Sequence, residues 1–305
     1  MIARIGPGHM RTLWKRFVLT LEMIKFEHSV FALPFAGVGA LLALRDSGYQ
    51  MAGLAWKLSW IAVAMVGARS AAMAFNRLLD SEIDARNPRT RARHLPAGRL
   101  SETFAWGFVA LASLVFLAAA RMLNPLCFRL APVALGLLFF YSFTKRFTTF
   151  SHLVLGLSLG IAPAAAWIAV RGSLDPGILL LTAAVTLWTA GFDIIYSCQD
   201  YEFDVGEGLF SYPRCFGIPG ALGIARAFHL AMLICLLALV YVFRLGPISL
   251  AGVAAVASLL AYEHRLVKAD DLSRVDAAFF TINGWVSVLF FCFWAADILL
   301  LRSGA

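Results

Sequence analysis

Long runs of apolar residues, separated by short polar connections, make up most of the 305-residue chain. A helix that crosses the hydrocarbon core of a bilayer needs about 20 predominantly apolar residues. The runs predict an all-α fold, a polytopic membrane helical bundle of about nine transmembrane helices that forms a single domain over residues 1–305. The eighth run is the shortest. The expected spans are 26–45, 53–75, 103–122, 126–143, 152–171, 178–198, 219–243, 247–262 and 278–301.

Composition and charge support a membrane protein over a soluble one. Hydrophobic residues make up 61% of the chain and charged residues only 14%. The formal net charge of +8 would suit nucleic-acid binding in a soluble domain. Here roughly 19 of the 26 Lys and Arg residues fall at the N-terminus and in alternate connections, on the side of the first acidic motif. The positive-inside rule makes that side cytoplasmic, and we expect a multi-pass protein of the bacterial inner (plasma) membrane. The expected environment is the lipid bilayer, with no nucleic acid and no obligate protein partner.

The first acidic motif lies where the second apolar run meets a basic connection. Asn76, Asp80 and Asp84 are spaced i, i+4, i+8, which aligns them on one face of a helix. Carboxylates at the mouth of an apolar bundle would repel one another without a cation, and Mg²⁺ prefers carboxylates together with substrate phosphate oxygens. A solvated helix end facing lipid head groups is the alternative. Three nearby arginines, which suit a phosphate group, favour a substrate site: Arg86, Arg89 and Arg93.

The second acidic motif comes about 120 residues later, at the end of the sixth apolar run. Its members Asp193, Tyr196, Asp200 and Asp204 are spaced i, i+3, i+7, i+11, again on one helical face. Asp193 follows directly on apolar residues, where an ionised side chain is costly and usually marks function. The alternative is a structural hydrogen bond from Asp193 to a neighbouring helix. Two facing acidic motifs predict a diphosphate held between metal ions, with Asn76, Asp80, Asp84, Asp200 and Asp204 as the candidate ligands.

A third polar pair ends the fourth apolar run. Tyr141 and Lys145 are four residues apart and share a helical face that points to the same side of the membrane. Lys145 could contact a phosphate and Tyr141 a nearby oxygen. Both residue types also anchor helices at the membrane boundary, which is the alternative interpretation.

These motifs together resemble the UbiA superfamily of membrane prenyltransferases. Asn76-x-x-x-Asp80-x-x-x-Asp84 with Arg86, Arg89 and Leu95-Pro96-x-Gly98 resembles its first signature, and Asp193-x-x-Tyr196-x-x-x-Asp200-x-x-x-Asp204 its second. Tyr141-x-x-x-Lys145 is similar to its intervening element. Two further stretches resemble the branch of bacterial 4-hydroxybenzoate and menaquinone-pathway enzymes: Lys25–His28 with Phe31–Phe35, and Tyr262–Val267.

The resemblance implies Mg²⁺-dependent transfer of a prenyl group from polyprenyl diphosphate to the ring carbon of an aromatic acid, 4-hydroxybenzoate or a related naphthoate, in ubiquinone or menaquinone synthesis. The acids and the candidate phosphate ligands Arg86, Arg93 and Lys145 would stabilise the leaving diphosphate. A carboxylate of the second motif, with Asp200 preferred and Asp193 beside it, would accept the acceptor's proton. Rival interpretations are transfer to a haem- or chlorophyll-type acceptor and, in another class, a cation-coupled secondary transporter. Acids clustered among arginines at one mouth favour a phosphate site.

One position departs from the commoner pattern of the family. Many members have Asp directly after the first Asn, and this chain has Arg77. Position 77 points about 100° away from the Asn76 face, so the aligned acids are retained. Arg77 either binds the carboxylate of the aromatic acid or contacts lipid phosphate.

Overall fold

The computed structural model describes residues 18–24 and 32–300, and in these ranges the secondary structure is helical. Among these described residues, eight helical segments are long and apolar enough to cross a membrane. They lie at the second to ninth of the expected spans. Their helices are α3 (Leu54–Leu79), α5 (Glu102–Leu123), α6 (Pro125–Thr144), α7 (Ser151–Arg171), α8 (Leu179–Ser197), α10 (Tyr212–Val242), α11 (Pro247–Leu266) and α12 (Asn283–Leu300).

The first expected span differs from the structure. Helix α2 covers Leu33–Asp46, which is 14 residues and shorter than a full crossing. Residues 26–31 of the expected span lie outside the described residues, as does Lys25–His28. Pro34 stands in the first turn of α2, where its missing N–H costs no helical hydrogen bond.

Helices α10 (Tyr212–Val242) and α11 (Pro247–Leu266) each extend beyond one end of the span expected from the sequence. Helix α10 begins at Tyr212 rather than at 219, because a short helical segment capped by Ser211 precedes a bend at Gly217 (φ 69°) and is followed by the longer helix. The positive φ at Gly217 suits a residue without a Cβ atom. The eighth run, the shortest expected span, forms a 20-residue helix. A π-helical turn, η4 (Ala277–Ile282), leads into α12.

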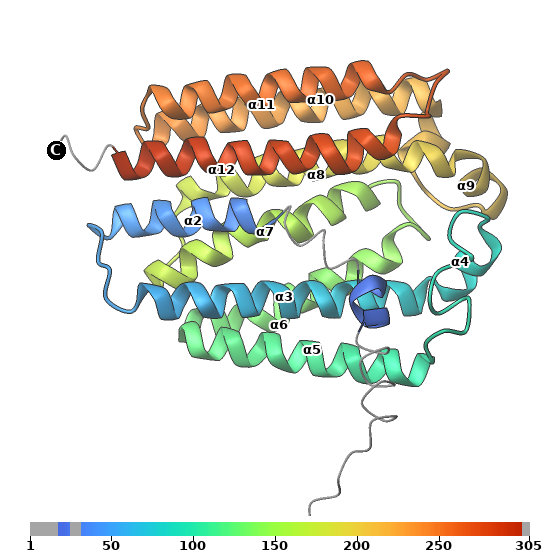
Figure 1. The fold of residues 1–305 in the computed structure, drawn as a ribbon, viewed down its shortest axis with the longest axis horizontal. Coiled ribbons are helices and arrows are strands. Elements are labelled where there is room, and N and C mark those ends of the chain that lie inside the picture. The colour runs from blue at the N-terminus through green and yellow to red at the C-terminus, as the bar shows by residue number, and fades with distance from the viewer. Residues whose placement is uncertain (1–17, 25–31, 301–305) are drawn as a thin grey trace, which may run out of the picture.

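The helices form an elongated bundle in which α7 and α8 lie in the middle (Figure 1). Helix α3 packs along α5, and α8 packs along both α7 and α10. The main apolar core joins α2, α7, α8, α10, α11 and α12 around the buried rings of Phe35, Trp188, Phe290 and Trp294. The short helices α4 (Ser81–Arg86) and α9 (Tyr201–Glu207) lie at the same end of the bundle. Both acidic motifs therefore open at one end of the molecule.

Each acidic motif bends instead of continuing as one straight helix. Helix α3 ends at Leu79, and Asp80 has non-helical angles (φ −92°, ψ 2°) before α4 begins. Asp200 has similar angles (φ −98°, ψ 6°) between a short 3₁₀ segment, η3 (Cys198–Asp200), and α9. At the first bend, Arg146 Nη2 donates to the Leu79 carbonyl at 2.9 Å. The helices expected at the two motifs are therefore interrupted at Asp80 and at Asp200. At the first interruption, Arg146 satisfies a carbonyl at the end of α3. Backbone hydrogen bonds still run from Asp80 to Asn76 and from Asp84 to Asp80.

Candidate active site

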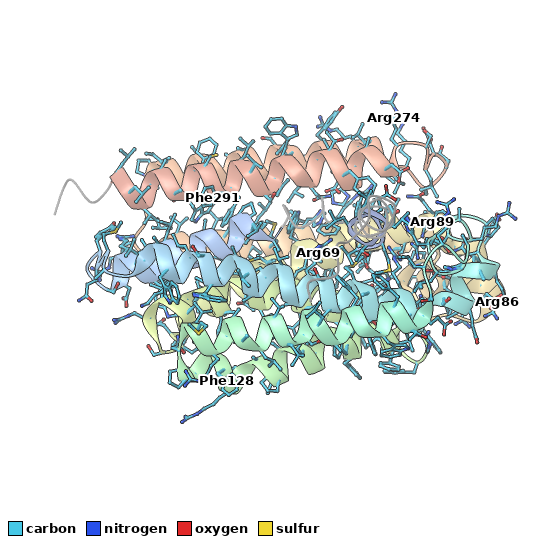
Figure 2. All side chains as sticks on the ribbon, turned by 60° about the horizontal axis from the view of Figure 1, so that its bottom comes forward. Arg69, Arg86, Arg89, Phe128, Arg274 and Phe291 are labelled. Carbon is cyan, nitrogen blue, oxygen red and sulfur yellow. The ribbon has the colours of Figure 1, made fainter. Side chains whose placement is uncertain are left out.

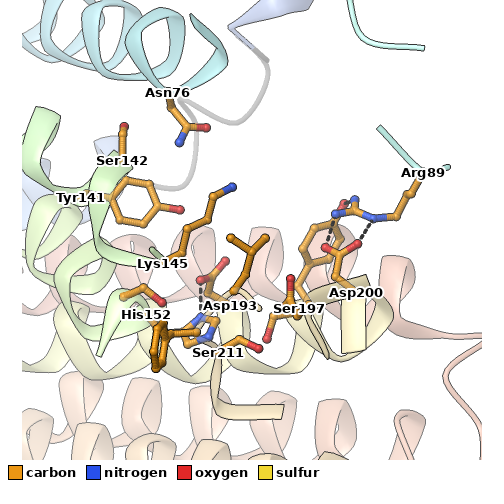
Figure 3. A pocket seen from close by; sticks show the side chains of 15 residues that line it. Asn76, Arg89, Tyr141, Ser142, Lys145, His152, Asp193, Ser197, Asp200 and Ser211 are labelled. Carbon is orange, nitrogen blue, oxygen red and sulfur yellow. Dashed lines mark hydrogen bonds and ion pairs between the residues drawn. The ribbon is translucent and has the colours of Figure 1, made fainter. Parts of the chain in front are cut away.

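A polar cavity of about 180 Å³ lies between the ends of α3, α6, α7 and α8. Figure 3 shows Asn76 and Tyr141 on one side and Asp193, Ser197 and Asp200 on another. Its lining combines amide, hydroxyl, carboxylate and cationic groups, which is the mixture that a phosphorylated ligand requires. The lining residues are Asn76, Arg89, Tyr141, Ser142, Lys145, Ser151, His152, Asp193, Tyr196, Ser197, Asp200, Asp204, Leu209, Phe210 and Ser211.

Asp80 is neutralised by two cations that follow α6. Lys145 Nζ lies 2.6 Å from Asp80 Oδ2, and Arg146 Nη2 lies 2.9 Å from Asp80 Oδ1. Asn76 also donates its amide to Oδ2 at 3.2 Å. The Asp80 residue is only 3% exposed and does not line the cavity. Its role in the structure is to hold Lys145, which does line it.

Asp84 is held in the same way by arginines. Arg93 Nη1 donates to both carboxylate oxygens at 2.7 Å, and Arg77 Nη1 lies 4.0 Å from Oδ2. The side chain of Arg77 is 12% exposed and faces this cluster. Arg86 instead pairs with Glu207 at 2.8 Å, which joins α4 to α9 at the outer end of the bundle.

Arg89 reaches from the connection after α4 to the second acidic motif. It donates through Nε and Nη2 to the two oxygens of Asp200 and through Nη1 to the Tyr196 hydroxyl at 3.0 Å. Asn87 donates to Asp200 as well, at 3.1 Å. Burial lowers the pKa of the Arg89 guanidinium, but the hydrogen bond and charge of Asp200 together raise it above its ordinary value. The arrangement places a permanent cation at the rim of the cavity.

Asp193 is paired with a histidine from the neighbouring helix. His152 Nδ1 lies 2.7 Å from Asp193 Oδ2, and both side chains line the cavity. The side chains are 6% and 20% exposed, respectively. A hydrogen bond to a partner on α7 was the alternative considered for Asp193, and the structure has one.

An apolar groove runs from the polar cavity along α3, α6 and α7. The two spaces share Asn76 and Tyr141 in their linings. The groove is walled by small and aliphatic side chains, with Ala72 and Met73 nearest in sequence to Asn76. Among the described residues that line the groove, Arg69 and the Tyr141 phenol are the ionisable side chains. Figure 2 shows Arg69 within the bundle, further from the end that carries Arg86 and Arg89.

Comparison with known families decides the identity of this bundle. The pattern of the UbiA prenyltransferase family matches residues 32–297, nearly the whole chain. The chain belongs to the UbiA prenyltransferase family. A 4-hydroxybenzoate octaprenyltransferase from Vibrio atlanticus is 32% identical over 232 residues, 74% of this chain and 81% of that protein. One from Nitrosospira multiformis is 31% identical, over 76% of this chain and 79% of that protein.

Solved structures of UbiA homologs have the same fold. The apo structure of a UbiA homolog from Aeropyrum pernix K1 superposes with a TM-score of 0.79 at 35% identity, covering 89% of this chain and 98% of that one. A homolog from Archaeoglobus fulgidus, solved bound to DMAPP and Mg²⁺, superposes with a TM-score of 0.68 at 20% identity, over 92% and 99% of the two chains. The all-α membrane bundle expected from the sequence is confirmed.

In this UbiA-family chain, eight of the expected site residues meet at the polar cavity: Asn76, Arg89, Tyr141, Lys145, Asp193, Tyr196, Asp200 and Asp204. Five do not line it: Arg77, Asp80, Asp84, Arg86 and Arg93. Four of these five, all but Arg86, form the ion-pair layer directly behind the cavity. Over residues 18–24 and 32–300, no group of three or more His, Cys, Asp or Glu side chains is arranged as ready metal ligands.

Sequence reasoning missed several polar residues of the UbiA site. His152, Asn87 and Arg146 contact the acidic residues directly. Arg146 follows Lys145 at the end of the fourth run, so a search for cations beside Lys145 would have found it. His152 and Asn87 have no local signal, because their partners lie 41 and 113 residues away.

Proposed function

We propose that the chain transfers a polyprenyl group from polyprenyl diphosphate to the ring carbon of an aromatic acid, 4-hydroxybenzoate or a related naphthoate. The observation that carries this proposal is the continuity of two unlike spaces. A cavity rich in carboxylates and cations shares Asn76 and Tyr141 with a groove that is almost entirely apolar. Such a pair fits a molecule with a charged head and a long hydrocarbon tail. The relatives named as 4-hydroxybenzoate octaprenyltransferases support the same substrates.

The donor set of the polar cavity fits Mg²⁺. Asn76 of α3, Asp200 of η3 and Asp204 of α9 offer oxygen donors within one cavity, and Mg²⁺ takes a few carboxylates together with phosphate oxygens. Asp80 and Asp84 stand directly behind them, each neutralised by protein cations. When substrate is bound, the metal ions in this proposal are held by Asn76, Asp80, Asp84, Asp200 and Asp204. There they would offset the negative charge that the leaving diphosphate acquires.

The protein's own cations bind the diphosphate in this proposal. Lys145 and Arg89 line the cavity, and their present partners are carboxylates. A phosphate oxygen can replace a carboxylate oxygen as the acceptor for either side chain. Negative charge builds on the diphosphate as the allylic C–O bond breaks, so donors fixed at that position lower the barrier. The allyl cation left in the groove is kept from water by its apolar walls.

Arg69 is our candidate for binding the acceptor's carboxylate. It lines the apolar groove seven residues before Asn76, which places it about two helical turns away on the same face of α3. A guanidinium in such a groove offers two parallel donors to a carboxylate. Arg77, the candidate from the sequence, is engaged with Asp84 and lines neither space. The geometry therefore favours Arg69 over Arg77 for this role.

The proposal is tested with purified protein, geranyl diphosphate and a panel of aromatic acids. We expect a C-prenylated product of 4-hydroxybenzoate or of a hydroxynaphthoate, identified by mass spectrometry. The activity should disappear in EDTA and return with excess Mg²⁺, while Asp80→Ala and Asp200→Ala should abolish it in protein that still inserts into membranes. Product formation undiminished by EDTA would contradict the metal role. Failure of every aromatic acid, with hydrolysis of the diphosphate intact, would contradict the acceptor class.

A further inference from the structure

His152 and Asp193 form an isolated acid–imidazole pair in the wall of the polar cavity. The pair joins α7 to α8 through a contact of 2.7 Å between Nδ1 and Oδ2. Tyr212 of α10 packs against the imidazole, with ring centroids 5.5 Å apart and planes tilted by 37°. The imidazole is thus fixed on one edge by the carboxylate and on one face by the phenol ring. Within the described part of the chain, Asp193 has no arginine or lysine partner, unlike Asp80, Asp84 and Asp200.

The hydrogen-bonding pattern decides which nitrogen of His152 carries the proton. His152 Nε2 is buried and has no hydrogen-bond partner among the described residues. A buried N–H without an acceptor is costly, and more so on a charged ring. The favoured form is the neutral tautomer with its proton on Nδ1, donated to Asp193 Oδ2. This form keeps Asp193 an anion and leaves Oδ1 as the carboxylate oxygen available to a ligand in the cavity.

We propose that Asp193 accepts the phenolic proton of the acceptor and that His152 is its positioning residue. This inference rests on the proposed function. Asp200, the first choice from sequence, is less suited because Arg89 donates to both of its oxygens and Asn87 adds a third donor. These donors already occupy both oxygens of Asp200, whereas Asp193 Oδ1 is not engaged by His152. Asp193 receives a single neutral donor and is 20% exposed in the cavity.

The step conserves atoms and charge. The phenolic O–H bond breaks and an O–H bond forms on Asp193, which gives a phenolate and a neutral carboxyl group. The phenolate's electron pair forms a bond from the ring carbon beside the oxygen to the prenyl C1, while the C1–O bond breaks and its electrons leave with the diphosphate. The released diphosphate takes the ring proton from that carbon, which restores the aromatic ring as a phenolate. The phenolate then takes its proton back from Asp193, which returns the carboxylate to its starting state. Phenolate charge makes this carbon more nucleophilic, so the rate depends on the position of Asp193.

Two matched substitutions of His152 test whether a hydrogen-bond donor is needed at the position of Nδ1 or at the position of Nε2. The amide nitrogen of Asn can occupy the place of Nδ1, whereas that of Gln falls nearer the place of Nε2. We expect His152→Asn to retain most of the turnover and His152→Gln and His152→Leu to lose about 10- to 100-fold in kcat, the range set by one hydrogen bond to a charged group. The KM for prenyl diphosphate should change little, because Lys145 and Arg89 bind that substrate.

A more acidic acceptor distinguishes a role in proton transfer from a role in packing. If His152 only packs the site, the loss in rate of His152→Leu should be the same on both acceptors. Ring fluorination of 4-hydroxybenzoate, with one carbon beside the phenol left free, ionises the phenol without help from the protein. The loss in rate of His152→Leu relative to wild type should therefore be smaller on the fluorinated acid than on 4-hydroxybenzoate, by up to about 10-fold. His94→Leu is the control, since His94 pairs with Glu22 at 3.0 Å outside the cavity. Its rate relative to wild type should be the same on both acceptors.

Equal losses for the Asn and Gln variants, or a loss for His152→Leu that is identical on the two acceptors, would overturn the role of His152. Retained turnover in Asp193→Asn on the unfluorinated acid would overturn Asp193 as the base. Failure of the proposed function is distinguished by the wild-type protein, which would then prenylate neither acceptor.

Discussion

At the residue scale, Asp80, Asp200 and Asp193 are each paired with a cation or an imidazole from another part of the chain. Asp80 meets Lys145 and Arg146, Asp200 meets Arg89, and Asp193 meets His152. Breaking one partner of a buried pair leaves an uncompensated charge, so these contacts fix side-chain positions even where they add little net stability. The site is preorganised by charge balance, and Arg69 stands apart from it in the apolar groove.

Arg69 and Arg77 give opposite predictions for one measurement. We expect Arg69→Lys to raise the KM for the aromatic acid by roughly 10- to 150-fold, because loss of a charge-assisted bidentate contact costs about 1.5–3 kcal/mol. Its KM for prenyl diphosphate should change much less. Arg77→Lys is the comparison, and it should leave the KM for the acid near the wild-type value. The reverse pattern in steady-state kinetics would assign the carboxylate to Arg77.

At the element scale, close contact between α7 and α8 sets the distance between His152 and Asp193. Gly156 lies one turn after His152 on the same face of α7. A Cβ atom there would stand 2.2 Å from the Thr186 carbonyl of α8. Glycine is needed at this crossing because the obstructing atom is backbone and has no rotamer by which to move aside.

Gly156→Ala should therefore push α7 away from α8. We expect a loss of about 1–3 kcal/mol in unfolding free energy, together with lower turnover as the pair at 2.7 Å lengthens. Thermal unfolding in detergent and steady-state kinetics measure the two effects. Gly223→Ala is the matched control, because its Cβ would meet no atom within 4 Å. A Gly156→Ala protein as stable and active as the control would show that the helices have room to adjust.

At the scale of the whole molecule, the two ends of the bundle differ in what their cations do. The end with α4 and α9 exposes Arg91, Arg99, Lys268 and Arg274 to the surroundings. At the opposite end, Arg45 donates to the Phe243 carbonyl at 2.9 Å and Lys57 to the Val170 carbonyl at 2.8 Å. These two cations donate hydrogen bonds to backbone carbonyls at the C-terminal ends of α10 and α7. Arg121, Arg129, Arg171 and Arg244 are also exposed at this opposite end of the bundle. The expectation of a cytoplasmic orientation for the site therefore rests on the distribution of Lys and Arg along the whole sequence.

Cysteine labelling tests this orientation. Introduced cysteines at Asp270, in the connection after α11, and at Ser173, after α7, lie at opposite ends of the bundle, and both positions are exposed. In a background with Cys215→Ser and Cys292→Ser, a membrane-impermeant maleimide should label Ser173→Cys in intact cells. Asp270→Cys should label only after the membrane is opened. The opposite result would place the polar cavity on the outer side.

The sequence by itself determined the elements and the two acidic motifs. Hydropathy is a local property, so the second to ninth spans could be located from their own residues, and Asp193 and Asp200 could be singled out by polarity in an apolar setting. Tyr141 and Lys145 are i, i+4 neighbours, and both line the polar cavity, as a shared helical face predicts.

Only the tertiary structure decided the partners of those residues. His152 meets Asp193 across 41 residues and Arg89 meets Asp200 across 111, contacts that no local pattern encodes. Asp80 and Asp84 were drawn behind the cavity by Lys145, Arg146 and Arg93, and the helix ends at Leu79, where Arg146 donates to the carbonyl. Charge pairing and hydrogen-bond satisfaction depend on which helices are neighbours, and packing of the assembled bundle sets those neighbours.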